Sequence, residues 1–398
     1  MKHVTPLRIL VAGLVIGAVP CAVAQTFTGL GTGAEAFGVA GDGSVVVGET
    51  PGFRWTPSAG LQQLGPLPGS ADPVVHAYSV SADGTFVVGA GTIGHVLQAY
   101  LWSDTEVRGL GFLDKTIPWS QARGVSADGS VVVGYSTIEP ATFAFRWTEA
   151  TGMVNLGSLP SSAPFSAAWA VSRDGTVIVG TSKSESGPEV FRWTEATGMV
   201  GLGDLPGGTY DSFALALSAD ANVIVGASYG PNGQEAIRWT QATGMVGLGD
   251  LPGGTFNSGA FAVSGDGSVV VGTGNGANGA EAFIWDATNG MRALRDVLIN
   301  DYGLDLTGWT LNGAAGVSDD GLVIAGTGTH NGTSEGWVAN LRPPCAGDVT
   351  GDNLVDLDDL STVLFNFGQT TPTGDADGDG VVDLDDLATV LFNFGNGC

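Results

Sequence analysis

Residues 168–208 read AWAVSRDGTVIVGTSKSESGPEVFRWTEATGMVGLGDLPGG and contain the unit that decides the fold. Asp174-Gly175 lies between two short apolar runs, and this dipeptide favours a hairpin with a type I′ turn, which needs positive φ at both central residues. The run Thr176–Val179 is β-branched throughout, as is typical of a strand buried on both faces. The first half of the unit therefore predicts two short, antiparallel strands.

The second half of the unit predicts two more strands. Phe191 and Trp193 alternate with polar residues, as in a strand near the surface. Thr197-Gly198 is a second turn signal, and Met199–Leu202 follows as a fourth short strand. No segment in the unit has helical periodicity. Four short strands in about 46 residues are the size of one propeller blade.

The unit recurs seven times along the chain. Its first marker is an Asp followed by a small residue, at Asp42, Asp83, Asp128, Asp174, Asp220, Asp266 and Asp320. Its second marker is a Trp after each Asp, at Trp55, Trp102, Trp147, Trp193, Trp239, Trp285 and Trp337. Since these residues occur in every copy, we interpret them as structural: the Asp in turns and the Trp in the packing between strands.

The two ends of the repeat region complement each other. The seventh copy stops after Gly336–Leu341 and lacks its fourth strand, while Phe27–Gly31 resembles the fourth-strand pattern of the other copies. An N-terminal strand that completes the last blade would close a ring and leave no open edge. We therefore predict a mainly β fold over residues 25–342, a seven-bladed β-propeller closed by its N-terminal strand, with a β-solenoid as the alternative.

These copies resemble the extracellular HAF repeat family. The resemblance rests on Val-Ser-x-Asp-Gly, Val-Val-Val-Gly, Phe-Arg-Trp-Thr and Gly-Met-Val-x-Leu-Gly, which recur in that order over residues 25–342. Asp220 departs from the pattern because Ala221 follows it, and Leu101-Trp102-Ser103 replaces the Phe-Arg-Trp-Thr motif in the second copy. The resemblance implies an exported repeat protein and no particular reaction.

The C-terminal residues contain two loops of twelve residues with oxygen-bearing side chains at loop positions 1, 3, 5, 9 and 12 and a backbone carbonyl at position 7. Oxygen donors in this order are what a calcium ion with six to eight ligands requires. In the first loop the predicted ligands are Asp348, Thr350, Asp352, Leu354, Asp356 and Asp359. In the second loop they are Asp375, Asp377, Asp379, Val381, Asp383 and Asp386.

A short amphipathic segment follows each loop. Leu360, Val363, Leu364 and Phe367 recur at helical spacing after the first loop, and the same pattern recurs from Leu387 to Phe394 after the second. Gly368 and Gly395 fit helix C-terminal caps. We expect a small all-α domain over residues 343–398, in which the two halves pack their apolar faces together.

This doubled pattern of loop and helix resembles a type I dockerin over residues 346–396. The resemblance implies EF-hand-like binding of two calcium ions by the residues named above, and a cohesin-like or cell-surface protein as partner. Two features depart from the family pattern. Leu357-Asp358 and Leu384-Asp385 stand where partner-binding dockerins carry hydroxyl residues, and the basic residues usual on the helix are absent. These departures favour a calcium-dependent attachment or spacer module, with cohesin binding as the alternative.

Residues 1–24 have the pattern of a signal peptide. Lys2 and Arg8 precede an apolar run from Ile9 to Val19, which is too short to span a bilayer, and Ala22–Ala24 fits a cleavage site. The chain is therefore predicted to be secreted, extracellular or at the cell surface. In such a compartment Cys345 and Cys398, which bracket the acidic tail, are predicted to form a disulfide. Free thiols or intermolecular pairing are the alternatives.

The charge and the scarcity of catalytic side chains limit the function classes. A net charge of −26 disfavours nucleic acid as a partner, and after residue 24 no apolar stretch is long enough for membrane insertion. Histidine occurs four times, in no metal-binding spacing, and no acid pair stands outside the repeats. We expect a non-enzymatic binding or structural protein, with an extracellular glycan as one class of ligand. A polysaccharide-degrading enzyme or cellulosome-type component is the alternative, and release of reducing sugar from a polysaccharide panel would identify it.

Overall fold

The computed structural model describes residues 25–49, 51–70, 75–343, 346–350, 355–371 and 373–395. The predicted signal peptide, Cys345, Cys398, Asp352 and Leu354 lie outside these ranges. The chain divides into two compact units: one is Gln25–Arg342 and the other contains the C-terminal residues from Pro343 on. No helix among the described residues has both the length and the apolar content needed to cross a membrane.

The first unit is mainly β, as the repeats predict, and is built from antiparallel four-stranded meanders. In the described residues, four sheets are separate meanders in chain order. The first two are β2 (Glu35–Val39), β3 (Val46–Glu49), β4 (Phe53–Thr56), β5 (Gly60–Gln63), and β6 (Val75–Val80), β7 (Val87–Ile93), β8 (Val96–Trp102), β9 (Val107–Gly111). The next two are β10 (Ser120–Val125), β11 (Val132–Ile138), β12 (Ala141–Thr148), β13 (Gly152–Asn155), and β14 (Ser166–Val171), β15 (Ile178–Lys183), β16 (Pro188–Thr194), β17 (Gly198–Gly201).

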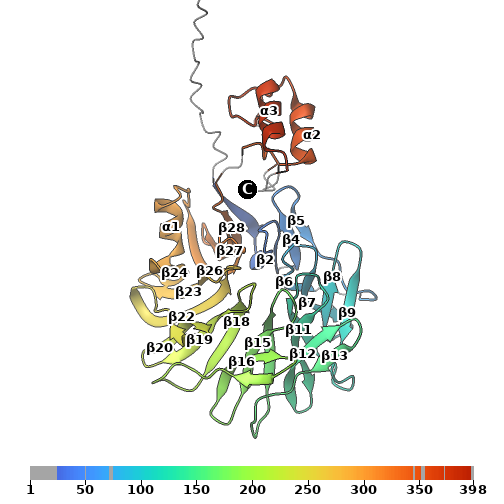
Figure 1. Ribbon diagram of the computed structural model, residues 1–398, viewed down its shortest axis with the longest axis vertical. Helices are drawn as coiled ribbons and strands as arrows, with labels where there is room; N and C mark the ends of the chain where they lie inside the picture. Colours follow the sequence, from blue (N-terminus) through green and yellow to red (C-terminus); the bar gives the residue numbers. More distant parts are fainter. Residues whose placement is uncertain are drawn as a thin grey trace, which may run out of the picture. The chain divides into compact units, whose positions relative to one another are not determined.

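The next two copies share one eight-stranded sheet, because a single parallel pairing of Gln234 with Asn257 joins their meanders. Its strands are β18 (Ser212–Leu217), β19 (Val223–Gly230), β20 (Gly233–Thr240), β21 (Gly244–Gly247), β22 (Gly253–Val263), β23 (Val269–Gly276), β24 (Gly279–Asp286) and β25 (Gly290–Ala293). Figure 1 shows the meanders following one another in chain order, from β2 in blue to β28 in orange.

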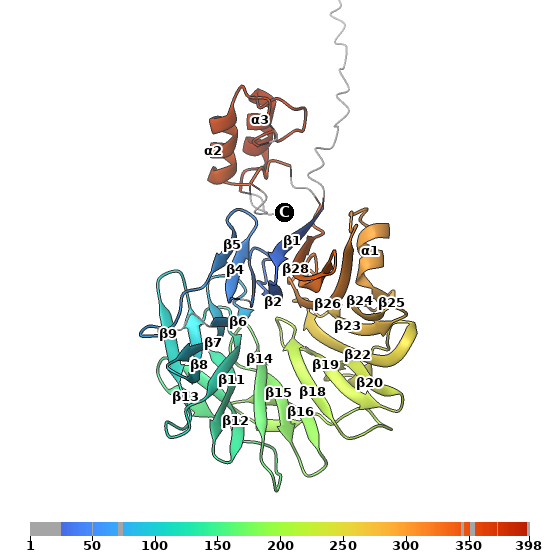
Figure 2. The same ribbon diagram turned by 180° about the vertical axis from the view of Figure 1, so that it is seen from behind.

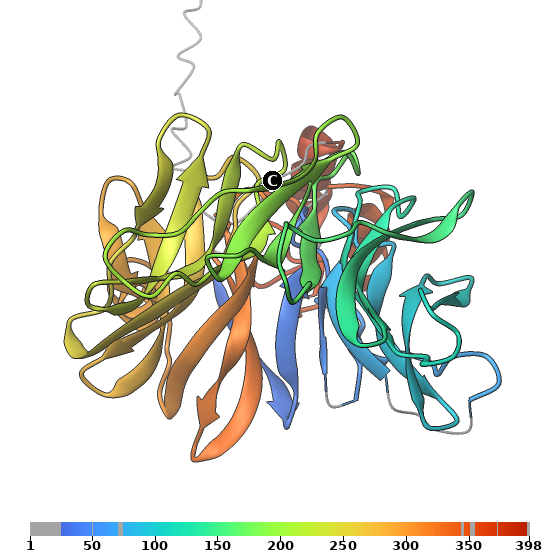
Figure 3. The same cartoon turned by 90° about the horizontal axis from the view of Figure 1, so that it is seen from below.

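The last sheet combines the two ends of the unit. It consists of β26 (Trp309–Val317), β27 (Val323–His330), β28 (Thr333–Asn340) and the N-terminal strand β1 (Thr26–Thr32). Strand β1 runs antiparallel to β28, with Phe27 opposite Ala339, and the predicted pairing of Phe27–Gly31 with the last copy is confirmed. Figure 2 shows β1 beside β28. The first and last copies also touch, since β2 contacts β26, β27 and β28 (Figure 3).

The hydrophobic core of this unit is divided among the spaces between neighbouring sheets. One cluster joins Val88 of β7 to Val132 and Phe145 of the next sheet, and the following cluster joins Val133 to Ile178 and further residues. The β-branched strand of each copy is buried on both faces because it packs against the sheet before it and the sheet after it. This is the physical reason for its continuous Val/Ile sequence.

The turn that carries the repeated Asp differs from the prediction. Gly175 has a φ of +71°, but Asp174 has no positive φ, so the type I′ prediction is wrong. Six residues separate β14 from β15, and the Gly175 N–H donates to the Ser172 carbonyl at 2.9 Å. A wider turn is stable here because the Asp174 carboxylate accepts hydrogen bonds from the Ser172 hydroxyl at 2.6 Å and the Thr176 N–H at 3.0 Å.

One helix interrupts the repeats. Leu294, Val297 and Leu298 stand at helical spacing in the sequence, and they form the buried face of α1 (Leu294–Asn300). These side chains join the core cluster around Trp309 and Trp337. The insertion therefore covers one end of the space between the sheet of β22–β25 and the last sheet.

The second unit contains the two helices that the tail predicts, α2 (Leu357–Asn366) and α3 (Leu384–Asn393). Gly368 and Gly395 follow them with φ values of +80° and +81°, as expected for C-terminal caps. The predicted face-to-face packing is only partly right. Val363 and Val390 are fully buried, but Leu364 and Leu391 are each 55% exposed, because Val355 and Val382 of the loops fill the core instead.

Candidate functional site

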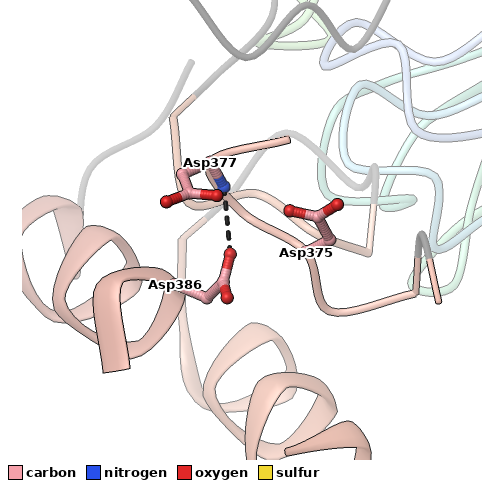
Figure 4. A group of neighbouring side chains, drawn as sticks. All are labelled: Asp375, Asp377 and Asp386. Atoms are coloured by element: carbon pink, nitrogen blue, oxygen red, sulfur yellow. Dashed lines mark hydrogen bonds between the residues drawn. The ribbon is translucent and has the colours of Figure 1, made fainter. Parts of the chain in front are cut away.

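Three carboxylates of the second loop converge. Asp375, Asp377 and Asp386 place one oxygen each within 4.8 Å of one another. Figure 4 shows Asp386 reaching from α3 toward the loop that carries Asp375 and Asp377. Asp379 and Asp383, also predicted as ligands, are not members of this group in the described residues. The structure thus brings together loop positions 1, 3 and 12 of the predicted set.

Asp386 is fully buried and holds the loop in its curved shape. One carboxylate oxygen accepts N–H bonds from Ala376 and from Asp377 at 3.1 Å, and the other accepts the Asp383 N–H at 2.6 Å. A carboxylate offers about four lone-pair sites. The last residue of such a calcium loop commonly binds through both oxygens, so bidentate binding by Asp386 would require some of these N–H bonds to be exchanged.

The residues at loop position 9 have a second role. Asp383 is the N-cap of α3, and its side chain accepts the Asp385 N–H at 2.9 Å. Asp356 caps α2 in the same way. Capping by a carboxylate satisfies free N–H groups and complements the positive end of the helix. These two acids therefore couple the loop to the start of the following helix.

The electrostatics of the second loop favour a cation. Burial raises the pKa of Asp377, and the charges of Asp386, Asp379 and Asp375 raise it further. Like charges at this separation oppose ionisation of all three carboxylates at once, and a divalent cation among them removes that penalty. Because all the donors are oxygens, the set suits a hard ion such as calcium.

The first loop repeats the same local geometry. Asp359 is fully buried, and its carboxylate accepts the Val349, Thr350 and Asp356 N–H groups at 2.9–3.0 Å. The Thr350 hydroxyl donates to Asp359 at 3.0 Å. Asp348 is largely buried beside them. The predicted ligands Asp352 and Leu354 lie outside the described residues, so this loop is known only in part.

Hydrogen bonds at the C-terminal ends of α2 and α3 connect the two halves of the tail. The Gly368 N–H, at the end of α2, donates to the Val382 carbonyl of the second loop at 2.7 Å. The Gly395 N–H, at the end of α3, donates to the Val355 carbonyl of the first loop at 2.7 Å. Each loop is thus hydrogen-bonded to the end of the opposite helix.

The tail also exposes apolar side chains in matching pairs. Phe365 and Phe392 are 84% and 88% exposed, and Leu357 and Leu384 are 69% and 67% exposed. Each pair occupies equivalent positions of α2 and α3. The same two side-chain positions are thus left exposed in both halves of the tail.

In the first unit, sequence reasoning missed one group of residues. The first strand of every copy contains a register shift, and the residue inside the shift lines a common cavity of about 490 Å³. These residues are Phe37, Tyr78, Arg123, Trp169, Leu215, Phe261 and Ala315. The available signal was a single variable position, flanked by an Ala and a small residue, in seven otherwise similar segments.

Three segments that differ from the other copies, residues 91–99, 114–121 and the insertion at 294–310, do not line this cavity. Residues 91–99 fall in the hairpin of β7 and β8, and the insertion forms α1. Segments whose length differs between copies therefore lie away from the cavity. The cavity is lined instead by residues at one position of the repeat that varies between copies.

No family model matches the chain, and no curated protein matches it. Among solved structures, the chain is similar to TolB from Acinetobacter baumannii, with 14% identity and a TM-score of 0.42 over 64% of this chain and 60% of that one. It is also similar to a putative TolB from Agrobacterium tumefaciens, with 17% identity and a TM-score of 0.41 over 57% of this chain and 82% of that one. The match spans less than two thirds of the Acinetobacter protein.

Proposed function

We propose that this chain is an exported, non-enzymatic binding or structural protein that is attached through a calcium-dependent, dockerin-like module. The convergence of Asp375, Asp377 and Asp386 around one point of the second loop is the observation that carries the proposal. Three carboxylates this close, with Asp386 fixed by three backbone N–H groups, form a preorganised site for a hard cation. Export and attachment rest on the signal-peptide pattern and the dockerin resemblance.

In this proposal each loop holds one calcium ion. Side-chain oxygens of Asp348, Thr350, Asp352, Asp356 and Asp359, with the Leu354 carbonyl, serve the first ion. The corresponding set from Asp375 to Asp386, with the Val381 carbonyl, serves the second. The equivalent hydrogen bonds of Asp359 and Asp386 support two sites of one kind. The disulfide between Cys345 and Cys398 remains a prediction and would close the module at its ends.

The exposed pairs on α2 and α3 support a protein partner for this module. Phe365 and Phe392 stand on equivalent turns of two similar helices, so one cohesin-like or cell-surface protein would meet the same apolar surface on either half. Burial of a Phe side chain contributes about 1.5–3 kcal/mol, which makes these residues natural contacts.

For the first unit we propose a seven-bladed β-propeller. The seven copies, the pairing of β1 with β28 and the contacts of β2 with the last sheet support a ring. A backbone bond also joins the first and last copies, since the Asp319 N–H donates to the Gly41 carbonyl at 2.8 Å. An open β-solenoid would leave its first and last copies apart.

Calcium titration of the full chain by calorimetry tests the calcium module. We expect two bound ions for the unaltered chain and one for either Asp386→Ala or Asp359→Ala, because each removes the carboxylate that organises its loop. Asp385→Ala is the matched control: it removes an equal charge from an exposed neighbour and should leave two ions bound. Absence of calcium binding by the unaltered chain would refute the proposal.

A further inference from the structure

The cavity of the first unit is built by the same backbone device in every copy. At each register shift the first strand carries one extra residue that has no partner on the second strand; Arg123, for example, lies between the paired residues Ala122 and Gly124. Bulges of this kind turn a side chain away from the plane of the sheet. The fold therefore directs seven side chains into one space and leaves their identity free to vary.

Most of these side chains are apolar or aromatic, and one is a cation. The Arg123 guanidinium carbon lies 3.8 Å from the centre of the Tyr78 ring and 5.1 Å from that of Trp169. Its Nη2 donates to Gln121 at 2.7 Å and to the Tyr135 hydroxyl at 2.9 Å. Stacking and hydrogen bonds therefore fix the guanidinium in place without a carboxylate.

Arg123 keeps unused capacity for an anion. Arg123 lines the cavity and is only partly buried, and no described acid forms an ion pair with it. Tyr78 does not neutralise it, because burial raises the pKa of this phenol to about 12. The other charged group of the lining is Glu35, at the start of β2. A cation held rigidly among aromatic rings is thus available to a ligand.

A second hollow of about 230 Å³ shares Phe37, Tyr78 and Arg123 with this cavity and extends to the turns of the repeats, where Arg173 of the fourth copy pairs with Asp319 of the seventh. Backbone bonds join neighbouring turns, as between the Ala127 N–H and the Arg173 carbonyl at 2.9 Å.

The lining decides which class of ligand fits. A hydroxyl-rich sugar needs a partner for each buried hydroxyl, and the lining offers few polar side chains, so burial of such a ligand would be costly. A phosphate would need more donors than one guanidinium supplies. A planar apolar body stacks on the rings, and one carboxylate matches one cation. A volume of about 490 Å³ lies within the range of small-molecule sites.

We propose that this cavity is a binding site for a small aromatic carboxylate, with Arg123 as the partner of the carboxylate and Tyr78 and Trp169 as stacking surfaces. The inference rests on the proposal that the first unit is a binding module, and it names the ligand of that module. It is independent of the calcium loops.

Calorimetry with the full chain and three probes tests this. The probes are 2-naphthoate, the uncharged 2-naphthalenemethanol with the same rings, and galacturonate as an acidic sugar. We expect one naphthoate per chain, bound at least about tenfold more tightly than the alcohol, because it gains a charge-assisted hydrogen bond. Galacturonate should not bind measurably. The same result is expected with calcium and with chelator, so failure here is distinct from failure of the calcium module.

Variants separate the contributions of charge and shape. Arg123→Met should abolish the preference for naphthoate over the alcohol, while continued binding of the alcohol shows that the variant is folded. Glu35→Gln should tighten naphthoate binding, and Ala315→Trp should weaken both naphthalene probes by filling the cavity. Arg192→Met, on β16 and outside the lining, is the matched control. It should change neither the preference for naphthoate nor the affinity for the two naphthalene probes.

Three results would overturn the proposal. They are absence of naphthoate binding, equal binding of naphthoate and the alcohol by the unaltered chain, and an unchanged preference in Arg123→Met. Tighter binding of galacturonate than of naphthoate would instead identify a sugar site.

Discussion

At the scale of single residues, the repeated Asp is a turn residue. In the fourth copy Asp174 accepts from the Ser172 hydroxyl, the Thr176 N–H and the Thr176 hydroxyl within 2.6–3.0 Å. The Ser172 hydroxyl in turn accepts the Val177 N–H at 2.9 Å. A carboxylate with three donors of its own is committed to the fold, which agrees with its presence in every copy.

This network predicts how stability depends on pH. The Ser172 hydroxyl, followed by the Thr176 N–H and hydroxyl, lowers the pKa of Asp174 below its ordinary 3.8. Because the pKa of Asp174 is lower in the folded than in the unfolded chain, its contribution to stability is complete above the unfolded-state pKa. This contribution is lost as the pH falls through the folded-state pKa. The melting temperature of the first unit should therefore decrease as the pH is lowered below about 4.

Asp174→Asn isolates one turn. At pH 7 it should destabilise the unit by about 0.5–1 kcal/mol, a small value because the carboxylate is exposed, and near pH 2 the difference from the unaltered chain should vanish. Asp204→Asn is a control of opposite sign, because burial raises the pKa of Asp204, so its removal should not destabilise at pH 7. Thermal unfolding at several pH values measures both. A constant difference for Asp174→Asn at all pH values would contradict this account.

At the scale of elements, β1 matters because it belongs to the last sheet although it is first in the chain. Leu30 is buried in the cluster that joins the first and last sheets, and Phe27 packs 5.9 Å from the Trp337 ring and 5.1 Å from the Trp309 ring. The hydrogen bonds between β1 and β28 cover an edge of β28 that would otherwise be open.

Deletion of residues 25–32 should therefore lower the melting temperature of the whole first unit, since it exposes Val338 and the edge of β28 and opens the contact between the first and last copies. Circular dichroism during heating measures this. Thr26→Ala, at an exposed position of the same strand, should leave the melting temperature unchanged. An unaffected melting temperature after the deletion would indicate an open array in which β1 is dispensable.

At the scale of the whole molecule, the two units obtain their stability in different ways. The first buries aliphatic and aromatic side chains between all its neighbouring sheets. Where the structure describes it, the second has five fully or largely buried apolar residues and two helices of 10 residues each, and its sequence has eleven acidic residues after Cys345. Helices this short are marginal alone, and clustered carboxylates repel one another.

Calcium should accordingly stabilise the second unit alone. Two ions add four positive charges where the carboxylates crowd, so binding energy becomes folding energy. Calorimetric heating of the full chain should show one transition that chelator removes and calcium restores, and another that neither changes. The transition of the first unit, identified by its loss of β-sheet signal, is the internal control. A calcium-insensitive tail, or a β transition that follows calcium, would contradict this division.

The sequence by itself determined the features that depend on local periodicity. Alternating strands, the positive φ of Gly175, the helical spacing of Leu294–Leu298 and the spacing of the acidic residues in the two loops are properties of short segments, and a single segment carries their signal. The pairing of β1 with β28 was also predictable, because one missing strand and one surplus strand carry the same pattern.

Only the tertiary structure decided where distant side chains meet. Arg123, Tyr78 and Trp169 belong to three copies, and nothing in one copy tells that its bulge residue faces the others. The turn around Asp174 is wider than its dipeptide predicts, because side-chain hydrogen bonds replace a tight hairpin. Leu364 and Leu391 are exposed although their helices are amphipathic, because loop residues Val355 and Val382 fill the small core. Such outcomes depend on which surfaces compete for burial, and that competition exists only once the chain is folded.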